Sequence, residues 1–183
     1  METTQTATAT KWVLDPTHSE INFKIKHMMI SNVTGSFTNF NVTAETEGDN
    51  FANSKVSFTT DVNSINTNNE QRDGHLKSAD FFDTEKYPQI KFEGTKFEKA
   101  SDEEYALHGN LTIRDVTKPV SLKVDFGGIA KDPYGNIKAG FTLDGKINRK
   151  DFGLTWNAAL EAGGVAVSED VRLDINIEIT KAK

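Results

Sequence analysis

Apolar and polar residues alternate without a break along the last segment of the chain, residues 169–180. The apolar positions are Val171, Leu173, Ile175, Ile177 and Ile179, and every residue between them is charged or carries an amide. A period of two residues is typical of a β-strand, because successive side chains point to opposite faces of a sheet. We therefore predict a strand with one face in the protein interior and one face in water.

Seven further segments show the same alternation. Their apolar rows occupy residues 21–25, 40–44, 56–62, 90–92, 105–113, 120–126 and 137–147. Residues 47–50 and 131–136 combine glycine with asparagine and aspartate, which favour turns. Eight strands joined by turns predict an all-β protein, either an antiparallel barrel or a sandwich. Whether Leu107 and Leu111 face the same side is left open, because a bulge would change the face.

Two short segments depart from the alternation. Thr67 and Glu70 have the spacing of a capping box and predict a short helix that continues to Lys77. Residues 157–161, which precede two glycines, predict a single helical turn. No change of composition divides the chain, so we expect a disordered tail at residues 1–10 and one domain at residues 11–183.

Composition excludes several classes of function. The 183 residues carry a net charge of −6, and the basic residues are scattered, which argues against nucleic-acid binding. The chain has no cysteine, which excludes disulfides and thiolate metal sites. No apolar run is long enough to span a bilayer. Residues 1–10 lack the features of a secretory signal, so the expected location is cytoplasmic, or periplasmic if a leader was removed.

The histidines do not have the spacing of a metal site, and we expect neither a metal nor a cofactor. Asp15, His18 and Ser19 have the residue types of a catalytic triad, but they precede a strand and lack a nucleophile elbow. A turn capped by Asp15 is the favoured interpretation. His27 continues the apolar row of residues 21–25, which favours a hydrogen-bonded core residue over a ligand or a catalyst.

Charged groups of both signs occur on the predicted short helix, at Arg72, Asp73 and His75. They allow an acid–base pair, but an ion pair that seats the helix across a barrel end is favoured. Asp151, Phe152 and Gly153 match a kinase triplet without the other kinase motifs, and this segment is predicted to be a turn that ends a strand.

Many of the 12 phenylalanines lie on the apolar rows. An eight-stranded barrel has an interior that side chains can fill or that can hold one small ligand. The alternation of residues does not decide between a packed core and a ligand cavity.

Several motifs together resemble the YceI-like family in their order and spacing. The resemblance rests on residues 12–19 with Ile21, Phe23 and His27, and on residues 35–37, 72–76, 81–83, 87–88, 109–114, 116–120 and 151–153. It implies a lipocalin-like antiparallel barrel of eight strands that holds a polyisoprenoid or a similar long-chain amphiphile. It implies no catalysis and no metal.

Apolar contact alone supports such a ligand, because each buried methylene contributes about 0.8 kcal/mol. A few isoprene units then reach the roughly 8 kcal/mol of a micromolar complex. The predicted lining follows from the inward rows and comprises Phe23, Ile25, Phe40, Val42, Phe58, Phe92, Phe126, Phe141, Leu173 and Ile175.

The leading hypothesis is non-enzymatic binding, transport or storage of an isoprenoid-type lipid of the polyprenyl or isoprenoid quinone class. The alternative is an isomerase or hydrolase that acts on an apolar substrate in the barrel. Its candidate catalytic residues are His27 or the segment from Arg72 to His75. A module that binds another protein is disfavoured by the evenly polar outer faces. Self-association as a homodimer is left open.

Overall fold

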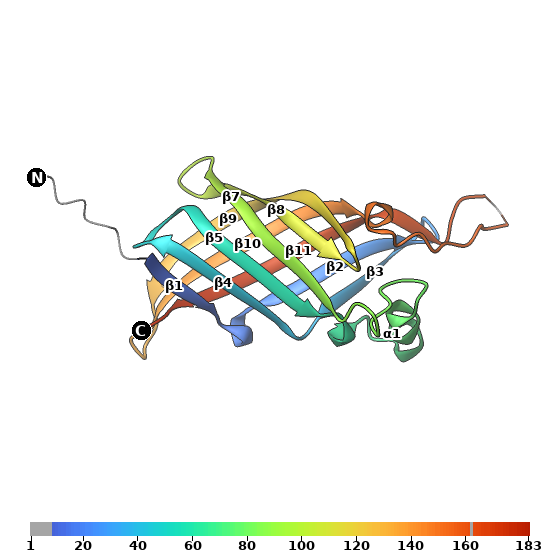
Figure 1. Cartoon of the computed structure of the whole chain (residues 1–183), viewed down its shortest axis with the longest axis horizontal. Coiled ribbons are helices and arrows are strands. Elements are labelled where there is room, and N and C mark those ends of the chain that lie inside the picture. Colours follow the sequence, from blue (N-terminus) through green and yellow to red (C-terminus); the bar gives the residue numbers. More distant parts are fainter. Residues whose placement is uncertain (1–8, 162) are drawn as a thin grey trace, which may run out of the picture.

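The computed structural model describes residues 9–161 and 163–183 (Figure 1). Within them, an 11-stranded antiparallel sheet is accompanied by one α-helix, α1 (Glu70–Lys77), and by the short 3₁₀ helices η1 (Pro16–His18), η2 (Val62–Ser64) and η3 (Arg149–Phe152). The strands are β1 (Ala9–Leu14), β2 (Glu20–His27), β3 (Ser31–Phe37), β4 (Phe40–Glu47), β5 (Asn50–Asp61), β6 (Ile65–Asn66), β7 (Gln89–Lys99), β8 (Glu104–Ile113), β9 (Val116–Lys131), β10 (Ile137–Asn148) and β11 (Val167–Lys181).

The sheet closes on itself because β1 pairs with both β4 and β11. The closed ring contains β1, β4, β5, β7, β8, β9, β10 and β11, which confirms the predicted all-β barrel of eight strands. Strand β11 is long enough to pair with β1 near its C-terminal end and with β2 nearer its start. Strands β2 and β3 therefore extend the barrel wall beyond the closed ring (Figure 1).

Strands β1, β3 and β6 were not among the predicted strands. Strand β3 is rich in small and polar residues and shows no apolar alternation, whereas β6 has only two residues. Strand β1 begins at Ala9, inside the predicted tail, and residues 1–8 lie outside the described residues. In β8, Leu107 and Leu111 are both buried on one face, which settles the question left open by the sequence.

Six aromatic side chains pack together in the barrel interior. They lie toward the end at which β1 begins and β11 ends, an end that can be followed in Figure 1. The ring centroid of Phe51 lies 5.1 Å from Trp12, 5.3 Å from Phe126 and 5.1 Å from Phe141. Phe97 and Tyr105 stack with their centroids 4.7 Å apart, and Tyr105 meets Phe126 edge-on. These contacts form one continuous cluster, which we call the aromatic plug. It comprises Trp12, Phe51, Phe97, Tyr105, Phe126 and Phe141.

Irregularities in three strands build the plug. The pairing of β4 with β5 shifts register near Asn53, whose φ is 62°, and both Phe51 and Ser54 are buried. The pairing of β7 with β8 shifts just before Phe97, and that of β9 with β10 shifts just after Phe126. A bulge changes which positions of a strand face inward. Aromatic residues at odd-numbered and at even-numbered positions of a strand can therefore point into the same end of the barrel.

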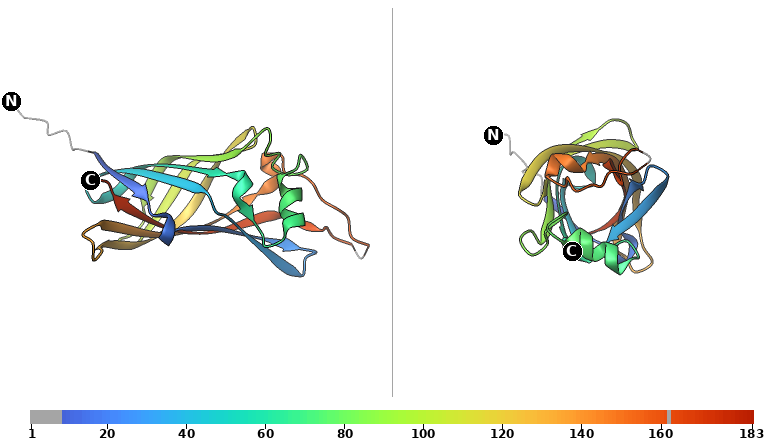
Figure 2. Two further views of the ribbon diagram at one scale, coloured as in Figure 1. Left: turned by 90° about the horizontal axis from the view of Figure 1, so that it is seen from below. Right: turned by 90° about the vertical axis from the view of Figure 1, so that its right-hand side faces the viewer.

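Helix α1 lies at the rim of the opposite end of the barrel (Figure 2). Its N-cap is Asn69, whose side chain accepts a hydrogen bond of 2.9 Å from the backbone N–H of Arg72. The predicted capping box is therefore wrong, although the helix exists. Thr67 instead donates its hydroxyl to Asp73, 2.5 Å away. No helix of the described chain has the length and apolar character needed to cross a membrane.

The helical turn predicted at residues 157–161 is also wrong. The side chain of Asn157 accepts from the N–H of Val167 at 3.1 Å and donates to its carbonyl at 2.7 Å. Ala159 forms a bridge with Val165. Asparagine side chains compete well with a helical backbone for hydrogen bonds, and here this one pairs with the next strand instead.

Gly109 on β8 allows Phe92 to pack against the strand. A Cβ atom at this position would overlap the Phe92 ring and lie 2.5 Å from the carbonyl oxygen of Glu93. We expect Gly109→Ala to lower the free energy of unfolding by about 3 kcal/mol, because a backbone oxygen cannot move freely. Urea denaturation measures this loss. Gly140→Ala is the control, since nothing lies within 4 Å of a Cβ there, and equal losses in both variants would contradict the prediction.

Candidate functional site

A cavity of about 440 Å³ lies inside the barrel. Phe51, Phe97 and Phe141 of the aromatic plug line it at one end, and Arg72, His75 and Leu76 of α1 line it at the other. Its volume falls within the range of small-molecule sites. The wall between the two ends is almost entirely apolar.

The structure places all but two of the predicted lining residues on this cavity. Phe126 belongs to the plug, where its ring stacks on Phe141 at 5.1 Å, and Phe40 packs beside Phe58 at 6.4 Å, outside the lining. Contact of the remaining residues with a ligand stays a prediction. The remaining residues are Phe23, Ile25, Val42, Phe58, Phe92, Phe141, Leu173 and Ile175.

The entire apolar row of β11 lines the cavity. Alternation therefore located the inner face of this strand correctly from Val171 to Ile179. The row also spans the cavity lengthwise, because β11 runs from the end of the barrel that carries α1 to the plug end (Figure 1).

His27 is not the hydrogen-bonded core residue that the sequence favoured. It is exposed at the end of β2, and its side chain has no hydrogen-bond partner in the described part of the chain. The apolar row of β2 simply continues to the barrel rim, where the strand reaches water. His27 and its exposed neighbour Lys26 both line the cavity, so this end of the cavity is open to solvent.

Arg149, which no pattern in the sequence marks, is 3 % exposed and lines the cavity. Its Nη1 donates to the carbonyls of Leu154 at 2.6 Å and Trp156 at 2.9 Å. Its Nε and Nη2 donate to the carbonyls of Ser168 at 2.8 Å and Val167 at 3.2 Å. Burial lowers the pKa of the guanidinium. Arg149 thus holds the loop between η3 and β11 against the barrel, and a lone arginine after a strand offers no periodic signal for this role.

Aromatic contacts join that loop to α1. The Trp156 ring lies edge-on to His75 with centroids 4.8 Å apart, and 5.4 Å from Phe81. His75 Nε2 lies 2.9 Å from Asp80 Oδ2, which gives α1 an ion pair when the imidazole is protonated. Asp151 and Phe152 lie in η3, and Gly153 ends it with φ 80°, which confirms the predicted turn.

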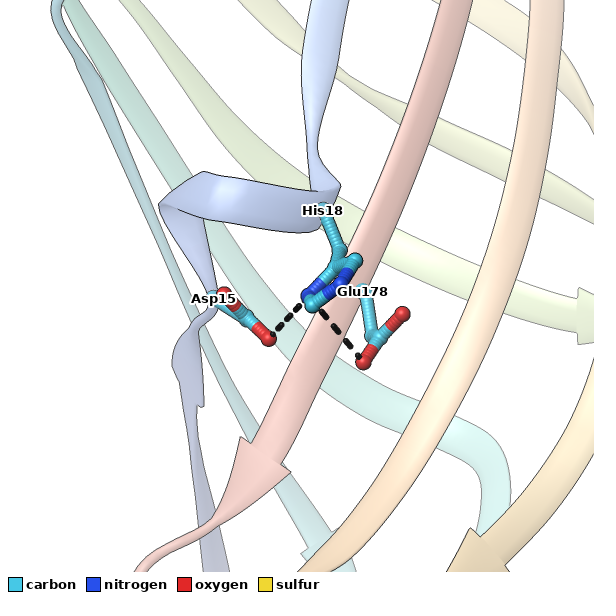
Figure 3. Close-up of side chains that lie close together, drawn as sticks. All are labelled: Asp15, His18 and Glu178. Carbon is cyan, nitrogen blue, oxygen red and sulfur yellow. Dashed lines mark hydrogen bonds and ion pairs between the residues drawn. The ribbon is translucent and has the colours of Figure 1, made fainter. Parts of the chain in front are cut away.

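Asp15, which caps η1, lies close to His18 of η1 and Glu178 of β11 (Figure 3). His18 Nδ1 is 2.9 Å from Asp15 Oδ2 and 3.9 Å from Glu178 Oε1. Their oxygen and nitrogen atoms could hold a metal ion, but Lys138 Nζ lies 2.8 Å from Asp15 Oδ2 and supplies a positive charge there. None of these residues lines the cavity.

The triad interpretation fails on geometry. The Ser19 hydroxyl donates to the carbonyl of Glu178 at 3.2 Å and accepts from its N–H at 2.9 Å, so it bridges backbone groups of β11. Asp15 Oδ1 accepts from the N–H of Thr17 at 3.1 Å, which confirms the capped turn. The hydrogen bond from Lys138 holds the pKa of Asp15 well below its usual range, and Asp15 in turn raises the pKa of both Lys138 and His18.

We expect Asp15→Asn to lower the free energy of unfolding by about 2 kcal/mol at pH 7, because the half-buried Lys138 loses a charged partner. A lowered pKa stabilises the fold above the unfolded-state pKa of about 3.9, and this contribution is lost as the pH falls through the folded-state pKa. The gap between wild type and variant should therefore shrink in acid. Denaturant titrations at pH 7 and in acid measure it.

Asp170→Asn is the matched control, because its pair with Lys146 is 3.4 Å long and both side chains are exposed. An exposed pair contributes at most about 1 kcal/mol. Equal losses for the two variants at pH 7, or a gap that does not change with pH, would contradict the proposed role of Asp15.

The closed antiparallel ring and the apolar cavity define a lipocalin-like β-barrel. The family model for the YceI-like domain matches residues 12–179, and the chain belongs to this family. A UPF0312 protein of Staphylococcus aureus is 41% identical over 172 residues, which cover 93% of this chain and 98% of that protein.

Solved structures share the fold. A YceI protein of Campylobacter jejuni is 37% identical and superposes with a TM-score of 0.76 over 87% of this chain and 91% of that one. A domain of Saccharophagus degradans, described as a polyisoprenoid binding domain implicated in plant cell wall breakdown, is 17% identical, with a TM-score of 0.66 over 93% of this chain and 98% of that one. The second likeness shows the fold alone.

Proposed function

We propose that this protein binds an isoprenoid-type lipid, of the polyprenyl or isoprenoid quinone class, and carries or stores it without chemical change. The observation that carries the proposal is an apolar cavity of about 440 Å³ that ends on an aromatic plug and opens beside α1. The description of the Saccharophagus degradans domain as polyisoprenoid-binding supports the ligand class at the level of the family.

The energetics of apolar contact agree with this ligand. Each buried methylene-sized group contributes about 0.8 kcal/mol, so a few five-carbon units contribute on the order of 10 kcal/mol before association costs.

Solvent extraction of the purified protein followed by mass spectrometry tests the proposal. We expect either a co-purified isoprenoid lipid or, after delipidation, uptake of an isoprenoid quinone. Trp156 lines the cavity whereas Trp12 is 1 % exposed within the plug, so ligand entry should quench mainly Trp156 fluorescence. Trp156→Phe removes that signal and serves as the control. The absence of both bound lipid and uptake would overturn the proposal.

The same extraction also tests the enzymatic alternative, because it shows whether the ligand has been changed chemically. His27 and His75 line the cavity and are the groups that could transfer a proton there. A carrier returns its ligand chemically unchanged after prolonged incubation. A converted product that is lost in His27→Gln or His75→Gln would favour an isomerase or hydrolase instead.

A further inference from the structure

The ionisable residues of the cavity wall share one sign. Among the described residues that line the cavity, the ionisable ones are Lys26, His27, Arg72, His75 and Arg149, and none is aspartate or glutamate. This bias runs against the composition of the chain, which carries 27 acidic and 21 basic residues. The basic character of the cavity wall therefore does not follow from the overall composition of the chain.

These residues also gather at one end of the cavity. His27 pairs in register with Val167, whose carbonyl accepts from Arg149 Nη2 at 3.2 Å. The Trp156 carbonyl accepts from Arg149 Nη1 at 2.9 Å, while the Trp156 ring packs edge-on against His75. Arg72 and His75 both lie on α1, which is at the rim of this end (Figure 2).

The two arginines have no carboxylate partner. Among the ion pairs of residues 9–161 and 163–183, none involves Arg72 or Arg149. Glu169, which acts on Arg149 from a distance, is paired with Lys150 at 2.8 Å. The charge of Arg149 is buried without an opposite charge in contact, which is costly because neutral carbonyls only partly replace water. An anion at this end of the cavity would remove that imbalance.

Both guanidinium groups also keep unused donors. A guanidinium has five N–H groups. Four bonds to backbone carbonyls leave Arg149 with one N–H on Nη2. Arg72 donates from Nε to the Thr67 hydroxyl at 2.8 Å and from Nη2 to the Thr67 carbonyl at 2.6 Å, and its Nη1 has no partner in the described chain.

From this arrangement we infer that the open end of the cavity is a binding site for a single anionic head group, a carboxylate or a phosphate, held by Arg72 and Arg149. This inference rests on the proposed function, which places the tail of the ligand in the apolar cavity. It narrows the ligand from any long apolar molecule to an anionic amphiphile. The planar guanidinium fork suits both head groups, because each presents paired oxygens.

Three ligands with the same geranylgeranyl tail test the inference: the alcohol, the carboxylic acid and the monophosphate. We expect the delipidated protein to bind at least one anionic ligand about tenfold or more tightly than the alcohol, which is the effect of one charge-assisted hydrogen bond. Arg72→Gln should reduce this preference, because it should weaken binding of the anionic ligands by a larger factor than binding of the alcohol. The preferred anion identifies the head group as a carboxylate or a phosphate.

Arg172→Gln is the matched control, because Arg172 is an exposed arginine of β11 that does not line the cavity. It should keep the preference for the anion. Equal affinity of the wild type for all three ligands would overturn the inference, as would a uniform loss in Arg72→Gln. Failure of every ligand to bind, the alcohol included, would instead overturn the proposed function.

Discussion

Replacing Leu173 by tryptophan is expected to weaken uptake of an isoprenoid quinone by about 100-fold while the barrel remains folded. Leu173 lies in the middle of the cavity-lining row of β11 and is only half-buried. A larger side chain there enters the cavity and displaces tail atoms of the ligand. Loss of contact for about four methylene-sized groups removes roughly 3 kcal/mol, which corresponds to that factor.

Quinone retained after gel filtration, measured per mole of protein, gives the result, and thermal melting verifies the fold. The control places the same tryptophan at Asp174, the next residue along β11, which is exposed on the outer face. Asp174→Trp should retain normal uptake. Undiminished uptake by Leu173→Trp would show that the ligand does not occupy the middle of the barrel.

Replacing Trp12 by alanine is expected to lower the free energy of unfolding by about 4 kcal/mol, the largest loss of stability that we predict. Trp12 is 1 % exposed, and its Nε1 donates to Thr46 Oγ1 at 2.8 Å. Its ring packs 5.1 Å from Phe51 and lies 5.5 Å below the Lys181 ammonium. Alanine leaves a hole in the plug and deprives the Thr46 hydroxyl of its donor.

For a chain of this length, the loss corresponds to a fall of roughly 12 °C in melting temperature. Trp12→Phe separates the two causes, because phenylalanine keeps the packing on Phe51 and gives up only the hydrogen bond. We expect about 1–2 kcal/mol for that variant. If Trp12→Ala proves no worse than Trp12→Phe, the plug does not depend on the ring of residue 12.

The barrel was predictable from the sequence because most of its strands have one face in the protein interior and one face in water. In β11 this alternation continues without interruption, and all five apolar positions from Val171 to Ile179 face inward as predicted. Strand β3 escaped prediction because Gly35 is one of its inward positions. A Cβ there would overlap the Phe23 ring, so the interior row contains a glycine where alternation expects an apolar side chain.

The ends of the cavity were less predictable than its wall. Phe51 and Phe97 face the interior because of register shifts. Neither residue belongs to the row of every second residue that faces inward along the rest of its strand. Arg149 is buried by carbonyls of a loop that follows it, and Arg72 is placed on the cavity by a helix. These positions depend on contacts between segments that are distant in the sequence, and the local pattern of apolar and polar residues does not predict such contacts.

The aromatic plug also gives the cavity a fixed depth. Under the proposed function, the tail would enter and leave at the end beside α1, and the head group would enter last and leave first. Each added isoprene unit gains contacts until the tail meets Phe51 and Phe141, and any further unit remains in water. For the proposed isoprenoid ligands, we therefore expect affinity to rise with chain length up to one value and then to stop rising, whatever the chemistry of the head group.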